Sequence, residues 1–222
     1  MKKTTLSVLA LSVAGVLSMP AQADMLLGGK IGYDAWYAKS DVSQQKDDET
    51  KLHSSFQASL EHFIPLVPNV KVRFTKVESD EDVNKVKFDQ LDLTAYYEIL
   101  DNDLVSVDAG LTLHKFGGGE AKLAGLSQTF DNYQPAVYGD VRVGIPATPL
   151  SVFATANVGS YDGSKTFDAE AGAIYSLGLV AADLNFKAGY RMMDHDLNFF
   201  SGKVSTLKYK QSGLFAGVEI DF

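Results

Sequence analysis

The chain has 222 residues, of which 45% are hydrophobic and 22% charged; it has no cysteine and a formal net charge of -8 at pH 7. Without cysteine it can form neither a disulfide framework nor thiol chemistry. The negative charge argues against nucleic acid as a partner, because nucleic acid recognition requires a basic surface.

The N-terminus has the three parts of a secretory signal peptide. Lys2-Lys3 is a short positive region, residues 6–17 are apolar, and Ala21-Gln22-Ala23 is a small-x-small cleavage site. The apolar run is too short to cross a bilayer as a helix. We therefore predict a signal peptide over residues 1–23 and one exported domain over residues 24–222. Loss of the two lysines would take the net charge from -8 to -10.

Beyond the signal, apolar and polar residues alternate with the period of two that is typical of β-strands. The alternation predicts a first strand over residues 26–38, a polar loop over 40–51 and a second strand over 52–62. Pro65 and Pro68 then predict a short turn, because proline interrupts a strand.

A third strand is predicted over residues 70–75 and is followed by an acidic loop over 78–84. The fourth strand, over residues 90–99, alternates regularly between apolar and polar side chains. Asp101-Asn102-Asp103 predicts a tight turn after it.

The fifth strand is predicted over residues 105–114. The glycine-rich stretch 117–131 predicts a flexible loop, and the sixth strand is expected over residues 134–145. Pro146 and Pro149 mark the next turn.

A seventh strand, over residues 151–161, alternates poorly because Phe153 falls in the polar phase, and an eighth is predicted over 167–175. The ninth covers residues 182–191. The last, residues 214–222, sets an apolar face against a mostly small or acidic one and ends on an aromatic residue, as the closing strand of a bacterial outer-membrane β-barrel does.

The predicted connections alternate between long polar loops after odd strands and short turns after even strands. This asymmetry is typical of outer-membrane barrels, which have long extracellular loops and short periplasmic turns. We therefore expect an all-β fold, a closed antiparallel transmembrane β-barrel of about ten strands, with eight or twelve as alternatives. Closure is required because the backbone N–H and C=O groups of an unpaired strand edge would find no hydrogen-bond partner in lipid.

Two sequence blocks resemble a family of predicted bacterial outer-membrane β-barrels named for a Gly-Gly pair, which Gly28-Gly29 would represent here. The first block runs from Glu61 to Phe74 and the second from Leu93 to Asn102. Ala188-Gly189-Tyr190-Arg191 and the C-terminal strand extend the resemblance. It implies an outer-membrane barrel, and the family carries no assigned substrate, reaction or catalytic residue.

The polar phase of the strands is rich in charge and predicts the residues that line the barrel lumen. The expected lining is Lys30, Asp34, Glu61, Lys71, Arg73, Asp92, Glu98, Asp108, Asp140, Arg142, Lys187, Arg191 and Glu219, with further acidic candidates at Glu170, Asp183 and Asp221. The acidic excess favours a narrow aqueous pathway for small or cationic solutes. The alternative is a packed interior in which these charges pair, because ten strands enclose little space.

Three histidines, His53, His114 and His195, are expected near the extracellular rim as solvated residues. A metal site, or a rim enzyme that hydrolyses lipid or peptide, would need these side chains to converge, and the expected separation of their strands argues against it. We predict no catalytic residue, no metal and no cofactor. Interfacial aromatic girdles are expected from Tyr33, Trp36, Tyr37, Tyr97, Tyr133, Tyr190 and Phe222.

The sequence thus predicts a monomeric barrel in the outer membrane of a Gram-negative bacterium. Its expected partners are outer-membrane lipid, lipopolysaccharide and the barrel-assembly machinery, which would read the terminal Phe222. The acidic residues of the loops at 47–49 and 78–82 are expected to be solvated, or to bind outer-leaflet lipids through divalent cations.

Overall fold

A computed structural model describes residues 27–43, 45–46, 50–80, 85–102, 104–123, 125–198 and 206–222. The predicted signal peptide, residues 1–23, lies outside the described residues, as do residues 44 and 47–49 of the polar loop at 40–51 and residues 81–84 of the acidic loop.

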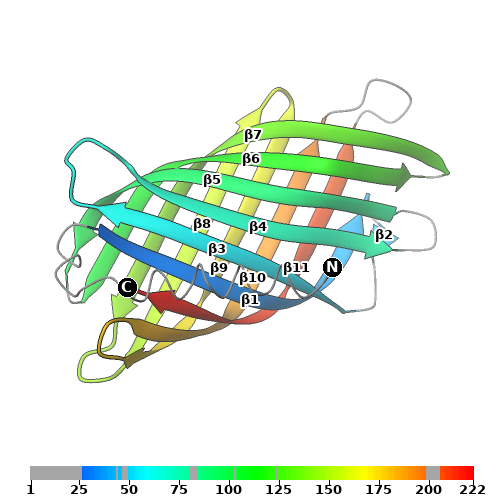
Figure 1. The fold of residues 1–222 in the computed structure, drawn as a ribbon. Helices are drawn as coiled ribbons and strands as arrows, with labels where there is room; N and C mark the ends of the chain where they lie inside the picture. The colour runs from blue at the N-terminus through cyan, green and yellow to red at the C-terminus, as the bar shows by residue number, and fades with distance from the viewer. Residues whose placement is uncertain are drawn as a thin grey trace, which may run out of the picture.

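The described chain is a closed antiparallel β-barrel (Figure 1). Apart from the two-residue β2, each strand pairs with the next strand along the chain, and the last strand pairs with the first. The strands are β1 (Leu27–Val42), β2 (Gln45–Lys46), β3 (Lys51–His62), β4 (Asn69–Asp80), β5 (Lys85–Asp101), β6 (Val105–Leu123), β7 (Leu126–Gly144), β8 (Leu150–Tyr161), β9 (Ser164–Gly178), β10 (Asp183–Leu197) and β11 (Leu207–Asp221). The two-residue β2 pairs only with the end of β1, so the wall has ten strands, as predicted.

The barrel closes between β1 and β11, from Lys30 opposite Asp221 to Val42 opposite Tyr209. Beyond this ladder, Gly29 and Phe222 exchange two backbone hydrogen bonds of 2.7 and 2.9 Å. Both ends of the described chain therefore lie at one end of the barrel. The part of the chain that the structure describes has no helix with the length and apolarity needed to cross a membrane.

The prediction of a flexible loop over residues 117–131 is wrong. β6 and β7 continue through it as a hairpin, with Leu123 opposite Leu126. The glycines serve the hairpin, because a register shift between Phe116 and Gly119 accommodates Gly118 at a φ of 58°, and Gly125 turns the chain at a φ of 83°.

The predicted difference in connection length is only partly correct: residues 198–206 form a long connection between β10 and β11, as predicted, but other connections at the same end are short. At the end of the barrel away from the C-terminus, β8 and β9 are joined by Asp162-Gly163 alone, both at positive φ, as a tight hairpin turn requires. At the opposite end, the connection between β3 and β4 spans residues 63–68. Extra length at the far end is instead built into the strands: β6 and β7 each have 19 residues.

The two faces of the barrel wall exchange polarity along the strands. On β5, the outward Leu91 and Leu93 are exposed and apolar, whereas the inward Gln90 and Asp92 are buried and polar. Nearer the far end, outward positions become charged and inward positions become buried and apolar. On β5 the outward residues there are Asp89, Lys87 and Lys85, and the inward residues are Phe88 and Val86.

The same exchange occurs on four further strands. The outward pairs at the change are Phe74/Lys76 on β4, Leu113/Lys115 on β6, Met192/Asp194 on β10 and Leu214/Ser212 on β11. An outward apolar band is what a barrel presents to lipid, and an outward charged wall is what it presents to water. The barrel therefore has a membrane band and, beyond it, a head with a soluble type of core.

Candidate functional site

The lumen is filled in layers that run from the C-terminal end of the barrel to the head. The first layer is an open vestibule of about 380 Å³ at the end that holds the C-terminus. Its lining includes Lys30, Glu61, Glu98, Asp108, Asp140, Arg142 and Asp221. Lys30 forms an ion pair of 2.6 Å with Glu61, and Thr155 donates a hydrogen bond to Asp140.

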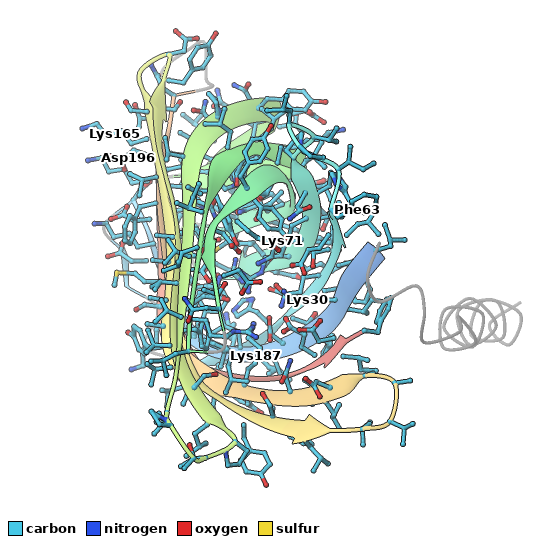
Figure 2. All side chains as sticks on the ribbon, turned by 90° about the vertical axis from the view of Figure 1, so that its left-hand side faces the viewer. Lys30, Phe63, Lys71, Lys165, Lys187 and Asp196 are labelled. Carbon is cyan, nitrogen blue, oxygen red and sulfur yellow. The ribbon has the colours of Figure 1, made fainter. Side chains whose placement is uncertain are left out.

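Above the vestibule the free space shrinks to a cavity of about 50 Å³ between Lys71, Lys187, Glu219 and their neighbours. This is the room of one or two water molecules. Figure 2 looks into this end of the barrel and shows Lys30, Lys71 and Lys187 pointing into the interior, whereas Lys165 and Asp196 lie on the outside. Arg142 and Lys187 both approach Glu219, at 3.5 and 4.0 Å.

The next layer is a charge belt made by Asp34, Arg73, Asp168, Glu170 and Arg191, all of them buried. Arg73 bonds Glu170 at 2.6 Å and Asp34 at 3.3 Å. Arg191 makes a bidentate contact with Asp168, at 3.0 and 2.7 Å. Each buried charge therefore has a partner of opposite sign, which burial requires.

Arg191 is held further by two neighbours. Its Nη1 donates to Ser55 Oγ at 2.8 Å, and its guanidinium lies 4.8 Å from the centre of the Trp36 ring. Trp36 is 1% exposed, so its prediction as a girdle residue is wrong. It occupies the inward phase two residues after Asp34, and its indole N–H donates to the carbonyl of Gly213 at 3.3 Å.

A glycine makes room for the charge belt. Gly217 stands opposite Asp34 in the β1–β11 ladder, and a Cβ at Gly217 would collide with the Asp34 carboxylate. We expect Gly217→Ala to displace that carboxylate from Arg73 and to lower the free energy of unfolding by about 1–3 kcal/mol. Equilibrium urea unfolding of the refolded barrel measures this loss.

The lipid-facing Gly139 is the matched control, since the nearest atom to its added Cβ is 4.0 Å away. Gly139→Ala should be neutral or slightly stabilising. Equal losses in the two variants would contradict the proposed collision at Asp34.

A polar layer lies above the charge belt and brings two of the predicted rim histidines together. His114 Nδ1 contacts Asp92 at 2.6 Å, and His195 Nδ1 contacts Thr166 at 2.8 Å. The two imidazole centres are 6.4 Å apart. Both rings are fully buried, and His53 is 6% exposed, so the prediction of solvated rim histidines is wrong.

The lumen ends in the apolar core of the head. This head core consists of Val42, Val77, Val86, Phe88, Phe116, Ala121, Leu123, Phe130, Leu197, Leu207 and Tyr209. The Phe88 ring lies 5.6 Å from Phe116, 5.9 Å from Phe130 and 5.5 Å from Tyr209. Side chains from both sides of the barrel thus meet across the lumen.

The thirteen predicted lining residues fall into these layers. Lys30, Glu61, Glu98, Asp108, Asp140 and Arg142 line the vestibule, and Lys71, Lys187 and Glu219 surround the small cavity. Asp34, Arg73 and Arg191 belong to the charge belt, and Asp92 to the polar layer. Of the further candidates, Asp221 lines the vestibule, Glu170 is in the belt, and Asp183 is exposed.

The described residues give little indication of a catalytic or metal site. Within the ranges that the structure describes, no group of three or more His, Cys, Asp or Glu side chains is arranged to hold a metal ion. The His114–Asp92 pair is sealed between the charge belt and the head core. We therefore interpret the layers as a packed interior.

No protein-family model and no curated protein matches the chain. Solved structures that resemble it are bacterial surface and outer-membrane barrels. Neisserial surface protein A is 19% identical, with a TM-score of 0.39, and the match covers 87% of this chain and 97% of that one. Ail of Yersinia pestis is 16% identical, with a TM-score of 0.36 and coverages of 86% and 98%.

The β domain of the Bordetella autotransporter BrkA is 11% identical, with a TM-score of 0.46 and coverages of 88% and 98%. Similarity at this level transfers no function. The closed wall, its apolar outward band and its polar interior are those of a Gram-negative outer-membrane β-barrel, and this chain is one.

Proposed function

We propose that this barrel is a sealed structural or interaction protein, which carries a rigid extracellular head. The observation that carries the proposal is the head core, where apolar side chains from β1, β4–β7, β10 and β11 meet inside the lumen. Such a core excludes water. The charged outward wall of the head then remains as the surface that faces the medium.

Orientation supports this role. Outer-membrane barrels keep their termini in the periplasm. The vestibule, at the end of the barrel that holds the C-terminus, would then open to the periplasm, and the head would project from the cell.

Single-channel recording of refolded residues 24–222 in a planar bilayer tests the proposal. We expect a correctly folded barrel, identified by its heat-modifiable electrophoretic mobility, to give no conductance steps. Reproducible steps with a cation preference, which change when Asp92 or Asp140 is neutralised, would instead support the narrow cation pathway.

The cation pathway remains the second candidate, and the acidic residues of the vestibule favour it. Glu61, Glu98, Asp108, Asp140 and Asp221 outnumber Lys30 and Arg142 there. The charge belt and the head core stand against it, because they occupy the remaining length of the lumen. A rim enzyme has less support, since His53 and His195 are buried.

Several features complete the proposal. The resemblance of residues 61–74 and 93–102 to the Gly-Gly family is our reason to place the chain near that family. We further propose export through the signal peptide at residues 1–23, assembly by the barrel-assembly machinery through Phe222, contact with lipopolysaccharide, and a monomeric state.

A further inference from the structure

The two sequence blocks that carry the family resemblance meet at the turn between β3 and β4. This turn, residues 63–68, lies at the end of the barrel where the C-terminus lies (Figure 1). Four of its residues expose large apolar side chains, namely Phe63, Ile64, Leu66 and Val67, and Leu66 is 91% exposed. A soluble turn seldom gathers so much apolar surface.

Two adjacent tyrosines of β5 form hydrogen bonds on opposite sides of the wall, one to the end of β3 and the other to the turn. Tyr96 faces the lumen, and its hydroxyl donates to Glu61 Oε1 at 2.9 Å. Tyr97 faces outward, in the phase of Leu91 and Leu93, and its hydroxyl donates to the Leu66 carbonyl at 2.9 Å. The turn must therefore lean over the lipid-facing wall and not over the vestibule.

The direction of Phe63 agrees with this placement. In Figure 2 its side chain lies outside the barrel wall and points away from the interior. Two apolar residues that follow Tyr97 in the sequence are also exposed: Ile99, on β5, and Leu104, in the next turn. The apolar turn thus continues the apolar band of the outer wall.

Part of the backbone of the turn already has hydrogen-bond partners within the chain, or no N–H group that needs one. Pro65 and Pro68 have no N–H group. The N–H of Ile64 donates to His62 Nδ1 at 3.3 Å, and that of Val67 donates to the Ile64 carbonyl at 3.4 Å. Polar backbone groups at membrane depth need such internal partners, whereas a turn in water does not.

Leu66 has a φ of 68°, which is uncommon for a bulky residue. Such a conformation persists when its surroundings determine it. The hydrogen bond from Tyr97 fixes the Leu66 carbonyl, and the Leu66 side chain is exposed in this conformation.

We propose that residues 63–68 form a lipid anchor, which inserts Phe63, Ile64 and Leu66 into the periplasmic leaflet and is held there by Tyr97. The partner is the bilayer surface itself. This inference does not depend on whether the lumen conducts, because it concerns only the outer wall.

Spin labelling tests the anchor, and the absence of cysteine makes it direct. Leu66→Cys is labelled with a nitroxide and refolded into phosphatidylcholine vesicles, and its collision rates with oxygen and with a water-soluble nickel chelate are compared. Leu93→Cys, on the lipid-facing wall, is the control for lipid. Asp101→Cys, on the vestibule lining, is the control for water.

We expect the oxygen-to-nickel ratio at Leu66 to approach that at Leu93 and to exceed that at Asp101 several-fold. Adding Tyr97→Phe, which removes only the hydroxyl, should lower the ratio at Leu66 and leave that at Leu93 unchanged. Phe63→Cys gives the same test if labelled Leu66→Cys fails to refold.

Nickel accessibility at Leu66 equal to that at Asp101 would overturn the anchor and leave the turn free in the periplasm for a protein partner. An unchanged ratio after Tyr97→Phe would overturn the role of Tyr97.

Discussion

Replacing Arg191 by methionine should lower the free energy of unfolding by about 3–5 kcal/mol, because it leaves the buried Asp168 carboxylate without its bidentate partner. Both side chains are nearly inaccessible, at 1% and 3% exposure. Methionine fills much of the same space, so the loss reports the unpaired charge and the lost contact with Trp36 more than a cavity. Equilibrium urea unfolding in vesicles, followed by circular dichroism, measures it.

Lys210→Met is the control for charge removal as such. Lys210 and Asp194 are 2.8 Å apart, but their side chains are 58% and 36% exposed. Solvent screens such a pair, so we expect no measurable change.

A double variant separates the unpaired charge from the packing. Asp168→Asn removes the carboxylate charge and keeps its shape, so Arg191→Met with Asp168→Asn should be less destabilised than the sum of the two single variants. Additive losses would contradict an energetic coupling between Arg191 and Asp168, and an Arg191→Met variant as stable as wild type would contradict a stabilising charge belt.

The membrane band was largely predictable from sequence, because each of its strands keeps one polarity on each face. The regular alternation at residues 90–99 is an example: Leu91 and Leu93 face outward, and Asp92 and Thr94 face inward. The same parity put Phe153 in the polar phase, and it would also have placed Trp36 in the lumen, since Trp36 shares the phase of Asp34. The prediction of Trp36 as a girdle residue followed its aromatic character instead. Inside the barrel both rings lie beside cations, Trp36 beside Arg191 and Phe153 beside Lys187.

The head was missed because the polarity of both faces reverses there. Phe116, Ala121 and Leu123 face inward, but the glycine-rich bulge after Phe116 shifts their parity, and the stretch looked like a loop. A search for charged outward residues that follow an apolar phase, such as Lys115 after Leu113, would have found the boundary.

The histidine pair depended on a distance that a strand count does not give. Spacing between strands places the walls that carry His114 and His195 far apart. The side chains project toward the barrel axis, however, and bring the ring centres to 6.4 Å. The predicted separation applied to the backbone and was then wrongly applied to the side chains.

A substitution in the head core should also destabilise the barrel strongly. Phe88 is 1% exposed and contacts three aromatic rings, so Phe88→Ala should lower the free energy of unfolding by about 3–5 kcal/mol, from lost apolar burial and the cavity left behind. Urea unfolding measures the loss. The matched control is Phe186→Ala, an aromatic residue on the lipid-facing wall that is 45% exposed, where lipid fills the space and the loss should be smaller.

Phe88→Ser distinguishes a sealed head from a water-filled lumen more sharply than alanine does. In a sealed core, Phe88→Ser would leave a cavity and would also bury a hydroxyl group without water. Its free energy of unfolding should therefore be lower than that of Phe88→Ala. In an aqueous lumen the hydroxyl would remain solvated, and serine would be tolerated at least as well as phenylalanine. A Phe88→Ser barrel as stable as wild type would therefore contradict a head core that excludes water. A Phe88→Ser barrel that is destabilised and does not conduct would support the sealed head. The apolar side chains inside the head would then serve its folding and not the passage of solute.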